Sequence, residues 1–159
     1  MRDRTNPVKG NIDLEVAAGL DNVLFGVWLV SRATTELLND ALRPSGLDAD
    51  EFAVYSVLMS ADAVTPSELA RWMAAPATTV SSYVKRLETR GHIERVPNPA
   101  DRRSFRLQLT KTGRKAHRDA AARFLPVLEL VRGALDRDEG GVQRSLRSIR
   151  RAVDTVRLH

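Results

Sequence analysis

Apolar residues recur in steps of four and three over the first part of the chain. The series is Val16, Leu20, Val23, Val27 and Val30, and Leu37 and Ala41 continue it. This spacing is typical of one face of a helix and predicts a helix over residues 12–42. At 1.5 Å per residue this helix is about 45 Å long. Because one small domain cannot cover so long a face, we expect part of it to pack on a second chain.

Short helices with clear start signals follow. Asp48 with Glu51, and Thr65 with Glu68, are spaced as capping pairs, in which a side-chain oxygen and a carboxylate satisfy the first free amides of a helix. A tight break then precedes another apolar pattern, which stops at Gly91, a residue suited to ending a helix. Helices are therefore predicted over residues 48–60, 65–73 and 77–90.

After Gly91 the apolar period changes from that of a helix to that of a strand. Residues 92–96 form a short strand candidate, and residues 105–109 alternate apolar and polar side chains. The intervening segment 97–103 is rich in turn-forming and charged residues. The pattern predicts a β-hairpin that follows the short helices.

Two further helices complete the predicted elements. Thr110 is suited to cap the first, which passes through Pro126, a residue that bends a helix more often than it ends one in such a pattern. Asp136 and Glu139 are spaced as a cap for the second. Its apolar positions again alternate in steps of four and three: Val142, Leu146, Ile149, Val153 and Val156. This seam is short for an independent coiled coil, so we expect it to dock beside the first helix of its own or a second chain.

Composition narrows the class of protein. The chain has 159 residues, of which 43% are hydrophobic and none is cysteine. This excludes disulfides, cysteine-based metal sites and thiol chemistry, and it is consistent with a cytoplasmic protein. No apolar stretch approaches the ~20 residues of a membrane span. The first residues are polar, unlike a secretory signal, so we expect a cytoplasmic location.

Positive charge is concentrated in one segment. Residues 76–118 carry 11 basic and 3 acidic side chains, whereas the whole chain has a net charge of +5. Such a segment is typical of a surface that binds a polyanion. An ordinary solvated basic face is the alternative, and charge alone does not separate the two.

The predicted helix 77–90 has a polar, cationic face. Val80, Val84 and Leu87 cluster on one side, with Thr78, Ser82, Lys85 and Thr89 opposite and Ser81 and Arg86 on the flanks. Hydroxyls can bond phosphates or base edges, and cations can neutralise phosphates or contact guanine. Because this helix follows a short capped helix through a tight break, the pair is typical of a helix-turn-helix. A small amphipathic helix with a basic exterior is the alternative.

The hairpin loop adds two arginines at or near its tip. Arg102 and Arg103 on a projecting turn could enter the narrow, electronegative minor groove of DNA. Asp101 beside them could hold a guanidinium in a bidentate pose. Strand parity leaves open which arginine would face DNA, and a flexible solvated turn is the alternative.

These segments together resemble the winged helix-turn-helix of the MarR family of bacterial transcriptional regulators. The resemblance covers residues 48–112 and rests on the order and spacing of several short motifs. They are Thr65-Pro66-Ser67-Glu68-Leu69-Ala70, Thr79-Val80-Ser81, Leu87-Glu88, Gly91, Ile93-Glu94-Arg95, Asp101-Arg102-Arg103, Leu107-Gln108-Leu109-Thr110 and Gly113.

The resemblance implies a mainly α fold with a small β-hairpin wing and N- and C-terminal dimerisation helices. Residues 46–113 would be the DNA-binding lobe, 11–45 and 114–159 the dimerisation region, and 1–10 a flexible tail. A homodimer would place each recognition helix in a major groove and each wing in a minor groove of double-stranded DNA, on a palindromic operator. The implied DNA contacts are Ser67, Thr78, Thr79, Ser81, Ser82, Lys85, Arg86, Arg102 and Arg103, with Asp101 as wing support. The Asp-x-Arg spacing of the family favours Arg103 for the minor groove.

One departure from the family pattern lies at the start of the recognition helix. Ala75 and Pro76 stand where a polar cap would begin it, so its free amides could instead face a phosphate.

Members of this family are often released from DNA by a small aromatic or phenolic compound, and the resemblance therefore predicts such an effector. Candidate pocket residues are Trp28, Arg32, Tyr55 and His117, which offer an indole, a phenol and a cation. Core packing is the alternative for Trp28 and Tyr55.

Other functions have weaker support. The three histidines lack the spacing of a metal site, and a carboxylate-rich site that assembles only in three dimensions is the alternative. The sequence has no phosphate-binding glycine loop, no Gly-x-Ser-x-Gly and no His-Glu-x-x-His motif, so we expect a non-enzyme without metal or cofactor. The sequence thus predicts a ligand-responsive repressor. A non-specific or architectural DNA-binding protein is the main alternative, and a protein-binding winged helix is a further one.

Overall fold

The computed structural model describes residues 22–136 and 138–157. The chain divides into two compact units, Met1–Leu37 and Leu38–His159, and we consider each by itself. The predicted tail and the first part of the predicted N-terminal helix lie outside the described residues.

The first helix begins in the first unit and ends in the second, where a short turn follows it. Helix α1 spans Val23–Leu42 and is followed by a 3₁₀ turn, η2, over Arg43–Ser45. Gly46 then adopts φ +74°, a left-handed conformation that glycine enters without steric cost. Within the first unit, α1 carries no buried residue among those described.

Three short helices begin where the capping pairs predicted. Helix α2 spans Ala49–Ser60, α3 spans Pro66–Met73 and α4 spans Ala77–Thr89. Asp48 with Glu51, and Thr65 with Glu68, both form complete capping boxes. The turn between α3 and α4 places Ala74 at φ +48°, and α4 is followed by Gly91 at φ +68°. The helix-turn-helix predicted from the sequence is therefore confirmed.

The hairpin is part of a three-stranded antiparallel sheet with the order β1–β3–β2. Strands β2 (Ile93–Pro97) and β3 (Phe105–Leu109) pair in register from Ile93 opposite Leu109 to Pro97 opposite Phe105. Strand β1 (Ala63–Val64) pairs with the other edge of β3. The sequence predicted the hairpin but not β1, because two residues are too few to show an alternating pattern.

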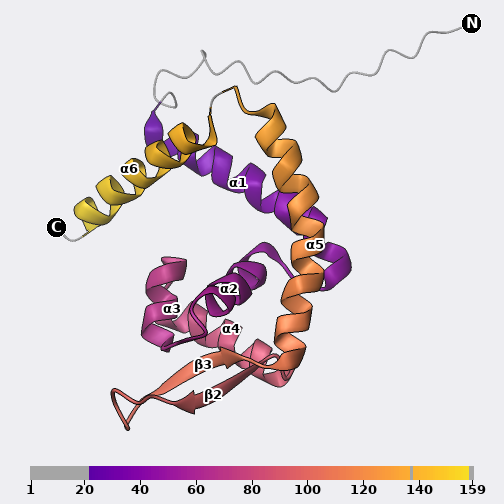
Figure 1. Ribbon diagram of the computed structural model, residues 1–159. Helices are drawn as coiled ribbons and strands as arrows, with labels where there is room; N and C mark the ends of the chain where they lie inside the picture. Colours follow the sequence, from indigo (N-terminus) through magenta and orange to yellow (C-terminus); the bar gives the residue numbers. More distant parts are fainter. Residues whose placement is uncertain (1–21, 137, 158–159) are drawn as a thin grey trace, which may run out of the picture. The chain divides into compact units, whose positions relative to one another are not determined.

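Two longer helices complete the described chain (Figure 1). Helix α5 spans Lys111–Ala134 and continues through Pro126, and its first turn is capped by Thr110 as predicted. Helix α6 spans Glu139–Arg157. The prediction that Asp136 caps this helix is wrong: the Gly141 amide donates to the carboxylate of Asp138, which lies immediately before the first helical residue.

The core lies among α2, α3, α4, the sheet and the start of α5. Its largest fully buried side chains are Tyr55, Leu42, Leu58, Leu69, Leu87, Leu107, Leu109, Val54 and Val80. Gly113 allows the start of α5 to approach the sheet, since a Cβ there would lie 2.0 Å from the His92 carbonyl oxygen. Across the described ranges, no helix combines the length and apolar character needed to cross a membrane.

Candidate nucleic-acid interface

Helix α4 has a buried apolar face and an exposed polar face. Val80, Val84 and Leu87 are buried in the core. The exposed residues of the helix include Thr78, Thr79, Ser81, Ser82, Lys85 and Arg86. The packing of three apolar side chains therefore fixes which polar side chains of α4 face solvent.

The polar side chains of this face differ in whether they form hydrogen bonds or ion pairs within the protein. The Ser82 hydroxyl donates to the Thr78 carbonyl oxygen at 3.2 Å and keeps its acceptor lone pairs. Within the described ranges, the side chains of Thr79 and Ser81 form no hydrogen bond, and Lys85 forms no ion pair. These groups are available to a ligand without breaking an internal contact.

The start of α4 has no side-chain cap. Pro76 occupies the N-cap position and offers no side-chain acceptor to the first amides. Pro76 and Ala77 are exposed, whereas Ala75 is partly buried against the core. A helix N-terminus with free amides carries partial positive charge, which favours an anion nearby.

Arg86 differs from its neighbour Lys85 because its guanidinium, although exposed, is paired with carboxylates of the protein. It lies 3.4 Å from the Glu51 carboxylate and 3.9 Å from that of Asp48, and it stacks over the Tyr83 ring at 4.9 Å. Arg86 was predicted to contact DNA. Its pairing with the carboxylates of α2 was not predicted, because they lie more than thirty residues earlier in the chain.

The wing is attached to α4 by a bidentate contact. The Arg95 guanidinium on β2 donates to both Glu88 oxygens, at 2.6 and 3.2 Å, and it stacks over the Phe105 ring of β3 at 4.3 Å. The Glu88 hydrogen bond, despite partial desolvation, raises the pKa of Arg95. On the other edge of the sheet, Arg106 donates to the Ala63 carbonyl oxygen. Sequence reasoning missed both contacts, since each joins separate elements.

The wing tip is ordered by its own short polar side chains. The Arg103 amide donates to the Asp101 carboxylate at 3.0 Å, and the Ser104 amide donates to the Asp101 carbonyl oxygen. Asn98 donates to the Ser104 hydroxyl at 2.7 Å. Asp101 was expected to hold a guanidinium, but in the structure its carboxylate bonds the backbone two residues on, as aspartates commonly do in turns.

This arrangement leaves the arginine side chains of the tip exposed. Arg102 and Arg103 are both exposed, and in the part of the chain that the structure describes neither guanidinium forms an ion pair. The hairpin loop projects away from the helices of its unit (Figure 1). Ser67, the predicted contact on α3, is also exposed, in the first turn after the capping residue.

The four predicted effector-pocket residues have different surroundings. Trp28 and Arg32 belong to the first unit, where Trp28 is 55% exposed and stacks on Phe25. Tyr55 and His117 belong to the second unit. Tyr55 is fully buried, so it lies in the core and not at a pocket surface.

His92 and His117, both partly buried, each pair with a hydroxyl of α2. The Tyr55 hydroxyl pairs with Nδ1 of His92, and His117 stacks on Phe52 while its Nε2 pairs with the Ser56 hydroxyl at 3.2 Å. Burial, assisted by the charge of a nearby arginine, lowers the pKa of each histidine. Burial also raises the pKa of Tyr55 to about 12, against the opposing charge of Arg90.

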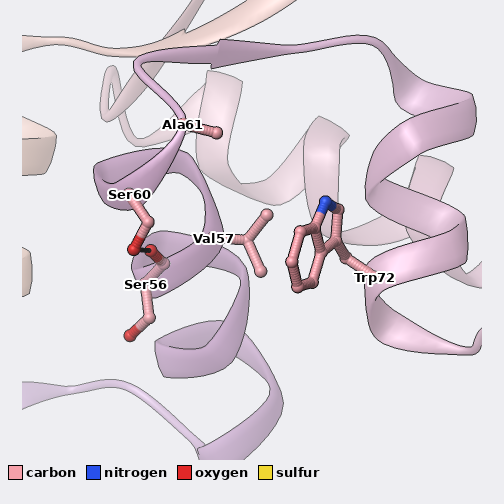
Figure 2. A pocket seen from close by; sticks show the side chains of 5 residues that line it. All are labelled: Ser56, Val57, Ser60, Ala61 and Trp72. Carbon is pink, nitrogen blue, oxygen red and sulfur yellow. Dashed lines mark hydrogen bonds between the residues drawn. The ribbon is translucent and has the colours of Figure 1, made fainter.

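A small apolar pocket lies between the ends of α2 and α3, and sequence reasoning did not find it. It has a volume of about 410 Å³ and is lined by Ser56, Val57, Ser60, Ala61 and Trp72. Figure 2 shows Val57 and Trp72 facing each other, while the hydroxyls of the two serines point away from the indole. The pocket therefore offers an aromatic face but little hydrogen bonding.

The order of these elements defines a class of protein. A capped helix, a tight turn, an exposed polar helix and a hairpin packed on its end form a winged helix-turn-helix. Residues 45–104 match the sequence model of the MarR family. This match is to the family that the sequence motifs resemble.

Curated relatives agree with this assignment. The multiple antibiotic resistance protein MarR of Salmonella typhimurium is 32% identical over 87 residues, which cover 55% of this chain and 60% of that protein. The transcriptional activatory protein BadR of Rhodopseudomonas palustris is 31% identical over 77 residues, or 46% of this chain and 44% of BadR. The matches thus span less than two thirds of these relatives.

Solved structures extend the likeness of the fold to most of the chain. The Mycobacterium tuberculosis regulator MosR, solved in complex with DNA, has a TM-score of 0.76 and 25% identity over 86% of this chain and 99% of MosR. CouR of Rhodococcus jostii, solved with p-coumaroyl-CoA, has a TM-score of 0.69 and 25% identity over 84% of this chain and 92% of CouR. The predicted mainly helical, winged fold is confirmed.

Proposed function

We propose that the protein is a sequence-specific DNA-binding transcriptional repressor that acts as a homodimer on a palindromic operator. One observation carries the proposal: α4 and the wing tip expose cations and hydroxyls that no other group of the described chain engages. Surplus cations on a projecting helix and turn are what a polyanionic duplex requires. The likeness to MosR, which was solved with DNA, supports the same conclusion.

The proposed contacts divide between the two grooves. The side chains of Thr78, Thr79, Ser81, Ser82 and Lys85, with Ser67 on α3, would contact bases and phosphates at the major groove. Arg103, with Arg102 beside it, would enter the minor groove, and Asp101 would support the wing through the turn backbone. The free amides at the start of α4 would face a phosphate.

A second copy of the chain is the proposed partner of the outer helices. Leu24 and Val30 on α1 are more than 60% exposed, and Val156 on α6 is 73% exposed. Exposed apolar faces of this extent are typical of protein–protein contacts. The assignment of residues 11–45 and 114–159 to dimerisation, and of 46–113 to DNA binding, is part of the proposal.

The first experiment is a DNase footprint on the DNA directly upstream of the protein's own gene, beside a scrambled duplex at physiological salt. A dimeric regulator gives a discrete, roughly palindromic footprint with half-sites about one helical turn apart. Affinity for that site should exceed affinity for the scrambled duplex by a factor on the order of 10³ or more. Equal, weak protection of both duplexes would favour the architectural alternative instead. In vitro transcription from the same DNA then tests repression.

Two substitutions test which residues carry binding. Lys85→Ala and Arg103→Ala should each weaken operator binding by roughly tenfold or more, and the double variant should abolish the footprint. Lys115→Ala removes the same charge from α5, where Lys115 is paired with Asp119, and should leave binding unchanged. Normal binding by the double variant would move the interface elsewhere and favour a protein-binding winged helix.

We further propose that a small aromatic or phenolic compound releases the protein from DNA. CouR, which was solved with p-coumaroyl-CoA, supports this class of effector. Salicylate is a suitable first probe, with tryptophan fluorescence and operator affinity as readouts. Trp28→Phe and Trp72→Phe separate a site near Trp28 and Arg32 from the pocket at Trp72. If salicylate-like compounds change neither readout, the effector proposal fails.

A further inference from the structure

Glu51 is a charged residue that is buried, and the proposed DNA contacts do not account for it. It lies in the first turn of α2 and is 2% exposed, which makes it the one buried charged residue within the described ranges. A buried carboxylate loses much of its hydration, so it persists only where cations or hydrogen-bond donors compensate it.

The compensating groups are two arginines of α4. Arg90 donates from Nη1 to Oε2 of Glu51 at 3.1 Å. Nη2 of Arg86 lies 3.4 Å from Oε1, which has no hydrogen-bond partner among the described residues. The Asp48 amide completes the set with a long hydrogen bond to Oε2. One carboxylate thus holds both arginines at once.

Further contacts direct the same face of α4 toward the same turn of α2. Tyr83, Arg86 and Arg90 are spaced by three and four residues, so they share one side of the helix. The Tyr83 hydroxyl donates to the Asp50 carboxylate at 2.7 Å, and the Tyr83 ring lies under the Arg86 guanidinium. These contacts with α2 therefore fix how α4 is rotated about its axis, and so they determine where its exposed polar face points.

Nearby carboxylates largely compensate the charge of Arg86 in this arrangement. Its guanidinium has a buried carboxylate at 3.4 Å and that of Asp48 at 3.9 Å, whereas Lys85, one residue earlier, has no ion pair in the described chain. A cation held by a carboxylate is less able to neutralise a phosphate, and so contributes less to the release of counterions from DNA. Lys85 and Arg86 are thus neighbours on one helix, but carboxylates of the described chain compensate the charge of Arg86 alone.

We propose that Glu51 is a positioning residue for DNA binding, which clamps the recognition helix α4 through Arg86 and Arg90, and that Arg86 serves this clamp and not a phosphate. The inference rests on the proposed function, since it concerns how α4 meets DNA. It assigns the affinity lost on changing Arg86 to misplacement of the helix.

Salt dependence separates a clamping arginine from a phosphate-binding one. Each neutralised phosphate contributes about −0.9 to the slope of log affinity against log salt concentration. On a mixed-sequence duplex of about 40 base pairs, Lys85→Gln should therefore reduce the steepness of the slope by about 0.9, whereas Arg86→Gln should leave it unchanged. A slope reduced equally by Arg86→Gln would overturn the proposal.

Operator affinity and a double-mutant cycle test the link to Glu51. Glu51→Gln and Arg86→Gln should each weaken binding to the footprinted operator by about tenfold, the equivalent of one base contact. The double variant should be no weaker than either single variant, because both changes open the same clamp. Multiplied losses would show that the two residues act independently, and the proposal would then be wrong.

Matched variants exclude a general charge or folding effect. Asp119→Asn makes the same change in net charge at an exposed pair on α5, and it should leave operator affinity unchanged or slightly higher. Circular dichroism and urea unfolding establish the folded fraction of each variant. If Glu51→Gln does not fold, Arg90→Gln removes the other arm of the clamp and should reproduce the affinity loss and unchanged slope of Arg86→Gln. A normal affinity in a folded Arg90→Gln would contradict the clamp.

The same measurements distinguish failure of the clamp from failure of the proposed function. If the wild-type protein binds neither duplex with a steep salt dependence, the proposed DNA-binding function is wrong, and the clamp's role in it is wrong as well. If the wild type binds steeply and only the Arg86 and Glu51 outcomes deviate, the function stands and the clamp alone is overturned.

Discussion

The winged helix-turn-helix lobe and the helices that flank it share one kind of apolar sequence pattern, but they differ in how far its apolar side chains are buried. In the lobe, Leu69, Leu87 and Leu107 are fully buried, whereas on α1 and α6 Leu24 is 64% and Val156 73% exposed. Both regions have apolar residues at helical spacing. The lobe completes its core with its own sheet, while the outer helices present apolar faces that the described chain leaves open. An amphipathic pattern thus predicts that a face will be covered, but not which chain covers it.

The largest expected effect falls on the core of the lobe. Leu107→Ala, in the central strand of the sheet, should lower the free energy of unfolding by about 2–5 kcal/mol, because it leaves a cavity among well-packed neighbours. Urea denaturation measures this change. Leu130→Ala makes the same deletion on α5 at a side chain that is 74% exposed in a single chain, and at concentrations where the protein is monomeric it should cost much less. An equal cost at both positions would break the comparison.

A charge on the open face of α6 should act on association instead of folding. Leu146→Glu, at a side chain that is 50% exposed, should weaken self-association by about 2 kcal/mol or more if this face meets a second copy. Analytical ultracentrifugation measures the dimer dissociation constant, and circular dichroism should show an intact fold. Ser148→Glu places the same charge off the apolar seam as a control. A monomeric wild-type protein at micromolar concentration would remove the basis of this prediction.

A smaller effect is expected at the junction of α2 and α4. Tyr83→Phe removes the hydrogen bond to Asp50, whose carboxylate is exposed and can bind water instead, so the free energy of unfolding should fall by only about 0.5–1 kcal/mol. Urea denaturation again provides the measurement. A loss near that of Leu107→Ala would mean that this polar contact, and not apolar packing, secures the recognition helix.

The smallest expected effect is a pH dependence of lobe stability. Burial first, and the charge of Arg90 second, lower the pKa of His92 in the folded protein from its ordinary value of 6.5. The unfolded chain therefore binds the proton more readily, and stability present above about pH 6.5 is lost as pH falls through the folded pKa. The facing groups are Tyr55, Arg90 and the carboxylate of Glu51, which favours the proton.

Unfolding free energies measured between about pH 7.5 and pH 5 test this linkage. His92→Gln should flatten the profile in part, because the pKa of His117 is lowered too, by burial and by the charge of Arg118. A profile that His92→Gln leaves unchanged would assign the whole dependence to other groups.

Local signals predicted the helices of the lobe well. The caps at Asp48, Thr65 and Thr110 and the end of α4 before Gly91 lie where the sequence placed them, since each depends on atoms only a few residues apart. The start of α6 was misplaced by choosing Asp136 over Asp138, because two aspartates near one helix start offer equivalent local signals.

The candidate site residues were named from the sequence, but the contacts that they make within the protein were not predicted. Lys85 and Arg86 look alike in the sequence, and only the fold brings Glu51 within 3.4 Å of one of them. The contact of Arg95 with Glu88, and the turn formed by Asp101, were likewise invisible to spacing arguments. Such contacts depend on how separate elements pack, which no short sequence window contains.

The sequence by itself determined the order of the elements, their caps, the apolar side of α4 and the concentration of cations between residues 76 and 118. These properties follow from local hydrogen bonding and from the periods of helix and strand. Only the tertiary structure decided that Tyr55 is core, that β1 joins the sheet and that Arg86 is engaged while Lys85 is not. The physical reason is that burial and ion pairing act through distances in space, which become fixed only when the elements pack together.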